Sequence, residues 1–260
     1  MKITAICILI VVFCVGIGNS LQKENFNDVD VGQKFLRERR TVGQRVLARW
    51  TNNLYYKGRV SAVSHVIDVD FDDGDKRSYH RNDNSAIIAD TIPKNVKYQD
   101  HVIASWKGGA KHYIGFVIKV DQALGYRVRF DDNDEGWYSK SSLRKFPHVP
   151  SPHALGSRVL ARWTNKLYYR GFVTKVHSSS VFINYDDGDT ITLSKSDASA
   201  VIADNLPACD DVKLGQRVIG YWPGRKRYYS GTVSALSSKY FVKFDDGDER
   251  WNAAYEVRIY

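Results

Sequence analysis

Cysteine is scarce in this chain, and its scarcity limits how the fold can be stabilised. The 260 residues include three cysteines, and two of them, Cys7 and Cys14, lie in an apolar run at the amino terminus. If that run is removed, Cys209 is the only thiol left and no disulfide can form within the chain. Because small secreted modules usually depend on disulfides, we expect packing between neighbouring segments to supply the stability here.

Long apolar runs and catalytic motifs are also missing. The one long apolar run covers residues 3–16, which rules out a protein that crosses a membrane several times. No phosphate-binding loop, Gly-x-Ser-x-Gly, Cys-x-x-Cys or His-Glu-x-x-His motif occurs. We therefore expect no catalytic site, no cofactor and no metal site. Acidic turns could bind Ca²⁺ weakly, but they lack the ligand spacing of an EF-hand loop.

The amino terminus has the features of a secretory leader. Lys2 precedes the apolar run, and small or polar residues end at Ser20, where we expect signal peptidase to cut. A buried strand is the alternative, but the run has no polar face. Further on, Arg37, Arg39 and Arg40 form a basic-x-basic-basic pattern that resembles a furin-type cleavage site, although a solvated charge cluster would look the same. The sequence thus predicts a signal peptide at 1–20, a propeptide at 21–40 and an extracellular location.

An internal duplication dominates the rest of the chain. The segment 43–60 returns 113 residues later as 156–173, with fourteen of eighteen positions identical. Two weaker copies lie between and after these segments and share the order Val-Ile-x-x-Trp, aromatic residues with a nearby Gly, and Phe-Asp-Asp. Such self-similarity predicts a tandem array of one structural unit.

The four copies alternate as A-B-A-B and set the predicted domain boundaries. The repeats cover 41–92, 97–147, 154–205 and 212–260. A linker at 148–153 contains two of the six prolines and should be stiff. We therefore expect 41–147 and 154–260 to behave as two units, each a packed pair.

Within one repeat the pattern is that of short strands. Residues 45–50 and 56–63 largely alternate polar and apolar side chains, and 66–71 forms a third strand. Asp72-Asp73-Gly74-Asp75 makes a hairpin turn, 76–80 returns as a fourth strand, and 86–89 closes the unit. Five short strands in about fifty residues suit a small closed barrel. The predicted class is all-β, with four tandem five-stranded barrels in two pairs.

These residues carry a family resemblance. Val-Leu-Ala-Arg-Trp (46–50), an aromatic-x-Gly step, Phe-Asp-Asp-Gly (71–74) and a short closing strand resemble the Tudor domain. More loosely, they are similar to the wider Royal superfamily of SH3-like barrels. The likeness covers all four repeats and is weakest in the second, where Asn133 replaces the turn glycine.

The resemblance implies an aromatic cage for a methylated lysine or arginine side chain at the mouth of each barrel. Ring faces attract a cation, and a carboxylate completes its neutralisation. The matching positions in chain order are Trp50, Tyr56, Phe71 and Asp73; Trp106, Tyr113, Phe130 and Asp132; Trp163, Tyr169, Tyr185 and Asp187; and Trp222, Tyr229, Phe244 and Asp246.

One departure from the family pattern concerns the residue after the turn. Caging family members often have an aromatic there, whereas these repeats have a carboxylate: Asp75, Asp134, Asp189 and Asp248. This favours cationic ligands in general over a trimethylated one in particular. The residues alone also allow a purely structural role, in which the rings fill a core and the acidic segment only makes a turn.

The excess of positive charge indicates a second kind of partner. Lysine and arginine exceed the acidic residues by nine, and many of them lie in or beside the loop between the first two strands of each repeat. They are Lys57, Arg59, Lys111, Lys166, Arg170, Arg225, Lys226 and Arg227. Repeated basic loops of this kind suit a polyanion such as a sulfated glycan, a mineral surface or a nucleic acid, and secretion disfavours the last.

Two functions remain open on this basis. The first is a secreted, non-catalytic repeat protein that acts as a multivalent binding or structural component of extracellular matrix, a mineralised structure or a secretion. The second is a reader of methylated lysine or arginine associated with chromatin or RNA. The predicted leader favours the first, because readers of chromatin do not enter the secretory pathway.

Overall fold

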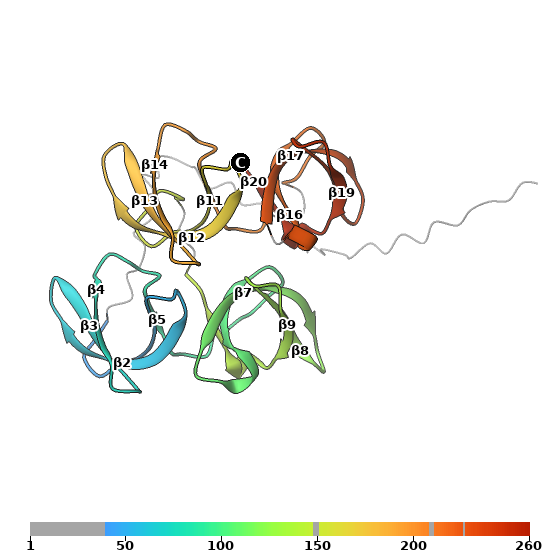
Figure 1. Ribbon diagram of the computed structural model, residues 1–260. Coiled ribbons are helices and arrows are strands. Elements are labelled where there is room, and N and C mark those ends of the chain that lie inside the picture. Colours follow the sequence, from blue (N-terminus) through green and yellow to red (C-terminus); the bar gives the residue numbers. More distant parts are fainter. Residues whose placement is uncertain (1–39, 148–150, 208–210, 226) are drawn as a thin grey trace, which may run out of the picture. The chain divides into compact units, whose positions relative to one another are not determined.

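The strands of the computed structural model follow one another in the same order four times (Figure 1). The structure describes residues 40–147, 151–207, 211–225 and 227–260. All of these lie in one of the two compact units of the chain, Glu38–Tyr260. The described residues contain twenty strands and four short 3₁₀ turns, and no α-helix is found among them. The predicted all-β class is confirmed.

The strands of the four repeats correspond one to one. The first repeat contains β1 (Arg45–Arg49), β2 (Tyr55–Val63), β3 (Val66–Phe71), β4 (Lys76–His80) and β5 (Ile87–Ala89). The second contains β6 (His101–Ser105), β7 (His112–Asp121), β8 (Gly125–Phe130), β9 (Glu135–Tyr138) and β10 (Leu143–Lys145). The third contains β11 (Arg158–Arg162), β12 (Tyr168–Val176), β13 (Ser180–Tyr185), β14 (Thr190–Ser194) and β15 (Val201–Ala203). The fourth contains β16 (Arg217–Trp222), β17 (Arg227–Leu236), β18 (Tyr240–Phe244), β19 (Glu249–Asn252) and β20 (Val257–Ile259).

The 3₁₀ turns distinguish the second and fourth repeats from the other two. They are η1 (Trp106–Gly108) and η2 (Lys140–Ser142) in the second repeat, and η3 (Pro223–Arg225) and η4 (Ala254–Glu256) in the fourth. Each of these repeats therefore has one such turn after its first strand and one before its last. The alternation of two repeat types seen in the sequence is thus also a structural difference.

Two antiparallel sheets of ten strands contain all of these elements. Strands β1–β10 form one sheet and β11–β20 the other. In the first repeat the hydrogen-bonded order is β5-β1-β2-β3-β4, and the other repeats follow the same order. A single residue pair joins the two repeats of each sheet, Tyr55 with His112 and Tyr168 with Tyr228. This sharing of sheets agrees with the pairing of the repeats inferred from the duplication.

The predicted closure of each repeat into a five-stranded barrel is not confirmed. Among the described residues no backbone ladder joins β4 to β5, the two outer strands of the order within the first repeat. Side chains bring these strands together instead, because Tyr79 of β4 and Ile87 of β5 belong to the same apolar core. With only three residues, β5 offers little backbone for a second ladder beyond the one it forms with β1.

The first strand of each repeat is buried on both faces, contrary to the polar–apolar alternation expected from the sequence. In β1, Val46 and Ala48 face the core of their own repeat. Leu47, on the opposite face, packs in a second core that contains residues of three repeats. Neighbouring repeats therefore cover a face that an isolated repeat would leave in water.

A bulge and a glycine bend the second strand. The β2 register shifts between Val60 and Ala62, and corresponding shifts occur in β7, β12 and β17. Gly58 lies opposite Phe71, and a Cβ built on it would lie 2.7 Å from the carbonyl oxygen of Asp70. A side chain at this position would force the two strands apart, which explains why glycine is needed here.

The hairpin turns need a left-handed residue. Gly74 has φ of +96°, and Gly188 and Gly247 have similar values. In the second repeat Asn133 takes this place with φ of +75°, a conformation that asparagine tolerates better than most residues. The turn of this repeat is therefore kept although its glycine is absent.

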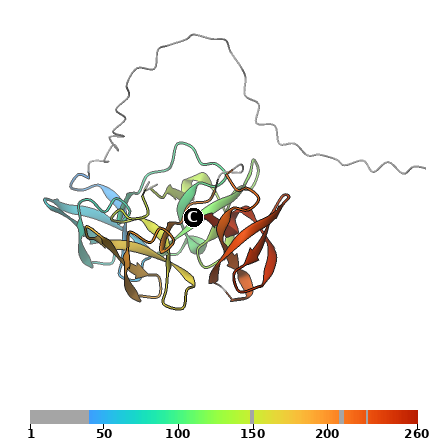
Figure 2. The ribbon, with the colours of Figure 1, turned by 90° about the horizontal axis from the view of Figure 1, so that it is seen from above.

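Apolar contacts cross the boundary between the two halves. Phe172 of β12 is fully buried in the core that also contains Tyr55 of the first repeat and Phe146 of the second. The Asn53 side chain of the first repeat donates a hydrogen bond to the Tyr185 carbonyl of the third, so segments far apart in the sequence lie side by side (Figure 2). The predicted pairs 41–147 and 154–260 each form one sheet, but one apolar core contains residues of both, and the described residues lie in a single compact unit.

A buried ion network reinforces this junction. Asp204 and Arg258 form a pair at 2.7 Å between side chains with 0% exposure, and Arg170 also contacts Asp204, at 2.8 Å. Arg158 and Arg170 both reach Asp131 of the second repeat. Burial alone would raise the pKa of Asp204, but the surrounding guanidinium groups hold it well below its ordinary value.

Several predicted features lie outside the described residues. These are the signal peptide at 1–20, the propeptide at 21–40 apart from Arg40, residues 148–150 of the linker, and Cys209. In the part of the chain that is described, no helix has the length and apolar character needed to span a bilayer.

Candidate functional site

Three aromatic side chains meet at one end of each repeat. We call this end the mouth of the repeat, and define it by the Trp, the Tyr, the central ring and the turn carboxylate predicted above. In the first mouth Trp50 lies edge-on to Phe71, with ring centroids 5.1 Å apart, and Tyr56 packs on the same core. The Trp–central ring distances are 5.7, 5.3 and 5.5 Å in the second, third and fourth mouths. The structure thus brings the predicted rings together in all four.

The local fold explains this meeting. Trp50 directly follows β1, Tyr56 is the second residue of β2, and Phe71 is the last residue of β3. In the paired strands Ala48 lies opposite Tyr56, and Gly58 lies opposite Phe71. Small residues beside large ones leave room for the rings to converge.

The rings differ in exposure, and this divides their roles. The central rings Phe71, Phe130, Tyr185 and Phe244 are at most 6% exposed and form part of the repeat cores. The Trp and Tyr side chains are half-buried and pack on the edge of each core. Only the Trp and Tyr can therefore offer a surface to a ligand, while the central ring supports them.

The second carboxylate of each turn stabilises the turn itself. Oδ1 of Asp73 accepts a hydrogen bond from the backbone N–H of Asp75 at 3.2 Å. Asp132, Asp187 and Asp246 accept the equivalent bond at 3.0, 3.1 and 3.2 Å. All four residues are exposed. The other oxygen of Asp246 faces Arg225 at 3.8 Å, and in the remaining three residues it is available for a cation.

The first carboxylate of the turn has a different partner, which the sequence analysis missed. Arg45 forms a two-bond pair with Asp72 at 2.5 and 2.7 Å. The same pairs join Arg158 to Asp186 and Arg217 to Asp245. In these three repeats an arginine begins the first strand and precedes the first turn aspartate by 27 or 28 residues. This recurring spacing is the signal that would have revealed the pairs.

The second mouth contains a fourth ring that the sequence analysis also missed. Tyr138 of β9 lies 5.6 Å from Phe130, on which Trp106 and Tyr113 also pack edge-on. Desolvation beside these rings raises the pKa of Asp132 above its ordinary value. This mouth also has an internal cation, since Nζ of Lys107 lies 5.4 Å from the centroid of the Trp106 ring.

Internal cations lie over the rings of two other mouths. In the first, the guanidinium of Arg77 is 5.7 Å from Trp50. In the fourth, Arg225 and Arg250 each lie 5.8 Å from Trp222, and Arg225 is also 5.9 Å from Tyr229. Within the described ranges, no cation is found over Trp163, Tyr169 or Tyr185 in the third mouth.

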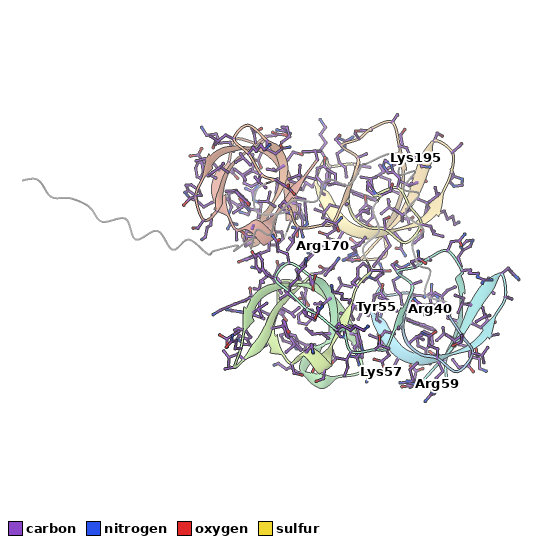
Figure 3. The ribbon with its side chains drawn as sticks, turned by 180° about the vertical axis from the view of Figure 1, so that it is seen from behind. Arg40, Tyr55, Lys57, Arg59, Arg170 and Lys195 are labelled. Atoms are coloured by element: carbon purple, nitrogen blue, oxygen red, sulfur yellow. The ribbon has the colours of Figure 1, made fainter. Side chains whose placement is uncertain are left out.

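The predicted array of basic loops is not repeated in the structure. Lys57 and Arg59 lie on β2, not in the loop, and are exposed (Figure 3). Arg170, the equivalent of Lys57, has a side chain only 11% exposed and pairs with Asp204 and Asp131. It is therefore not available to a polyanion, because two carboxylates already hold its charge. Lys111, Lys166, Arg225 and Arg227 are exposed, and Lys226 lies outside the described residues.

Of the predicted processing residues, only Arg40 is described. Its guanidinium donates a hydrogen bond of 2.6 Å to the carbonyl of Ile87 in β5. Ser20, Arg37 and Arg39 lie outside the described residues. In the described part of the chain, no group of three or more His, Cys, Asp or Glu side chains is arranged to hold a metal ion.

Comparisons with known proteins assign neither a family nor a function to this chain. A family model described as "Domain of unknown function (DUF4537)" matches residues 43–148, less than half of the chain. A search among curated proteins finds no match. Among solved structures, the chain is similar to the extended-Tudor 10-11 of Drosophila melanogaster, at 9% identity and a TM-score of 0.20, over 84% of this chain and 79% of that one. At that TM-score the likeness has no bearing on the fold or function of this chain.

Proposed function

We propose that the chain is a non-catalytic binding protein whose repeats take cationic side chains at their mouths. The observation that supports this is the repeated arrangement of a half-buried Trp and Tyr beside an exposed turn carboxylate. Ring faces attract a cation, and the carboxylate adds a counter-charge on the same side. Each repeat then has the binding role that its Tudor-like sequence pattern implies.

Several mouths on one chain suit a multivalent partner. A single exposed cation–ring contact contributes about 0.5–1 kcal/mol, so one mouth alone would bind weakly. Linking such sites raises the overall affinity by 10²–10⁴ when a partner can engage them together. A matrix or a secretion with many positive side chains would provide such a partner.

The proposed place of action is outside the cell, in extracellular matrix, a mineralised structure or a secretion. The apolar run at 3–16 and the basic pattern ending at Arg40 support this. The test is to express the full chain in cultured cells and determine its location and amino terminus. Secretion of a chain that begins at Leu21 or Thr41 is expected. Nuclear retention with an intact amino terminus would instead favour the reader of methylated lysine or arginine.

The binding site is tested by removing the turn charge without changing shape. The double change Asp73→Asn and Asp187→Asn keeps the Oδ1 acceptor of each turn and removes the carboxylate charge. For a cationic peptide we expect a loss of about 1–2 kcal/mol per site, measured by calorimetric titration.

The control for the same experiment targets the exposed basic strand. Lys57→Ala with Arg59→Ala should leave cation binding unchanged. If binding to a sulfated glycan occurs and only this variant weakens it and reduces its salt dependence, then the basic strand is the site and the mouths are not.

A further inference from the structure

Arg225 occupies the fourth mouth in the manner of a bound ligand. Its guanidinium lies 5.8 Å from the ring centroid of Trp222 and 5.9 Å from that of Tyr229. Its two terminal nitrogens lie 3.8 Å from a carboxylate oxygen of Asp246 and 3.6 Å from one of Asp248. One guanidinium therefore lies within ion-pair distance of two turn carboxylates and beside two rings, while 55% of the Arg225 side chain stays exposed.

The second of these carboxylates determines which cation suits the mouth. Asp248 stands where an aromatic ring would favour a fully methylated ammonium, which has no N–H to donate. A carboxylate instead suits a guanidinium, which has five N–H donors in a planar fork. Contact with the Tyr229 hydroxyl and with both carboxylates also raises the pKa of Arg225, so the charged form is favoured.

A longer loop places Arg225 in the mouth. Six residues separate Trp222 from Tyr229, whereas five separate Trp163 from Tyr169 in the third repeat. The additional residue accommodates η3, which ends at Arg225. The third repeat has no 3₁₀ turn at this place.

The third mouth has the same ligand groups and no internal cation. Trp163 and Tyr169 are half-buried, and Asp187 and Asp189 are exposed in the turn. Within the described residues, no cation lies over either ring and no ion pair involves either aspartate. At the position from which Arg250 reaches Trp222, this repeat has Ile191, which packs on the core.

We propose that the third mouth binds an arginine side chain of a partner in the way that the fourth mouth holds Arg225. This rests on the proposed function and adds two things to it. The ligand class is the guanidinium of arginine, and the mouths are not equivalent, because Arg225 of the chain itself already lies in the fourth. An outside arginine reaches the fourth mouth only after Arg225 has left it.

The indole N–H signals of the full ¹⁵N-labelled chain test this directly. Trp163→Phe and Trp222→Phe identify the two signals, and acetyl-Gly-Arg-Gly-amide is the probe. Matched peptides with lysine and with trimethyllysine in place of arginine compare the ligand classes. We expect the arginine peptide to shift the Trp163 signal and to leave the Trp222 signal in place.

Variants separate the two parts of the proposal. Arg225→Ala should make the Trp222 signal respond to the arginine peptide. Lys239→Ala is the matched control, since it removes one exposed charge at the opposite end of strands β17 and β18. Asp187→Asn with Asp189→Asn should weaken the response of Trp163 about tenfold or more, because both charge-assisted contacts are lost.

Three outcomes would overturn the inference, and they are distinguishable. An equal response of Trp163 to trimethyllysine and arginine rejects the ligand class and leaves the proposed function intact. A Trp222 signal that stays silent both in Arg225→Ala and in Arg225→Ala with Arg250→Ala rejects the role of Arg225, since Arg250 lies equally near the Trp222 ring. If no Trp signal responds to any of the three peptides, the proposed function fails as well.

Discussion

The same position in two nearly identical repeats has opposite environments. Lys57 and Arg170 follow the same Leu-Tyr-Tyr sequence, yet Lys57 is exposed and Arg170 is enclosed by Asp131 and Asp204. The local sequence cannot distinguish them, because the difference arises from which repeats lie alongside. The assignment of Arg170 to a polyanion site was wrong for this reason.

Asp204 provides the sharpest test of the buried network. Asp204→Asn removes the carboxylate that pairs with the buried Arg258 and one of the two carboxylates that pair with Arg170, and should cost about 3–5 kcal/mol of unfolding free energy. Asp90→Asn is the matched control in the first half, where the one ion pair of the Asp90 carboxylate within the described residues is with Arg144 and both side chains are partly exposed. We expect about 1–2 kcal/mol for the control, from urea unfolding of both variants. Equal losses would mean that the network adds nothing beyond a single pair.

The difference in unfolding free energy between the natural chain and Asp204→Asn should depend on pH in a definite direction. The pKa of Asp204 is lower in the folded chain than its ordinary 3.8, so folding favours the ionised form. Its contribution is therefore fully present above about pH 5 and is lost as the pH falls through and below 3.8. The difference in stability between the natural chain and Asp204→Asn should shrink over this acid range.

At the level of strands and turns, the sequence was a good guide. The short apolar segments place most strands correctly, and the three Asp-Asp-Gly-Asp segments together with Asp-Asp-Asn-Asp of the second repeat place the four hairpin turns. The 3₁₀ turns were missed because they are single turns with no periodicity to detect. Barrel closure was predicted from the number and length of the strands and from the Tudor resemblance, but among the described residues the three-residue β5 pairs only with β1.

Gly58, which lies opposite the last residue of the third strand, has no room for a side chain. Gly58→Ala would place a Cβ 2.7 Å from the Asp70 carbonyl oxygen and 2.9 Å from Val69, so β2 and β3 would have to separate. We expect a loss of about 1–3 kcal/mol by thermal unfolding. Gly224→Ala is the control, since its Cβ would find its nearest neighbour at 3.8 Å. A change within about 0.5 kcal/mol is expected there.

Of the candidate site, the sequence predicted the rings and the turn carboxylates, and their convergence followed from strand register. It did not predict the fourth ring Tyr138 or the internal ligand Arg225. Both depend on where a strand or loop returns in space, and neither carries a motif of its own. The ion pairs made by the first carboxylate of a hairpin turn, such as Arg45–Asp72, were missed although their spacing recurs. An arginine and an aspartate at these positions also fit a solvated surface.

Across the described unit, one position shows why the repeats are not interchangeable. It is the residue that follows the glycine of the second strand of each repeat. Phe116 and Phe172 occupy it in the two middle repeats and are buried, whereas Arg59 and Thr232 occupy it in the outer two. Arg258 of the fourth repeat lies over Phe116, and Arg49 of the first lies over Phe172. The middle repeats thus present apolar rings to neighbours in the other half, and the outer repeats present polar groups.

Phe172→Ala tests whether these contacts join the halves into one cooperative unit. The ring is fully buried against residues of the first and second repeats, so its removal should cost about 3–5 kcal/mol. Because the loss falls on the contact between halves, calorimetry should show one unfolding transition in the natural chain and two in the variant. Val181→Ala is the control, since Val181 is equally buried but lies in the core of the third repeat alone. It should lower the transition temperature without splitting the transition. A single transition in both variants would show that the ion network around Asp204 holds the halves together without the ring.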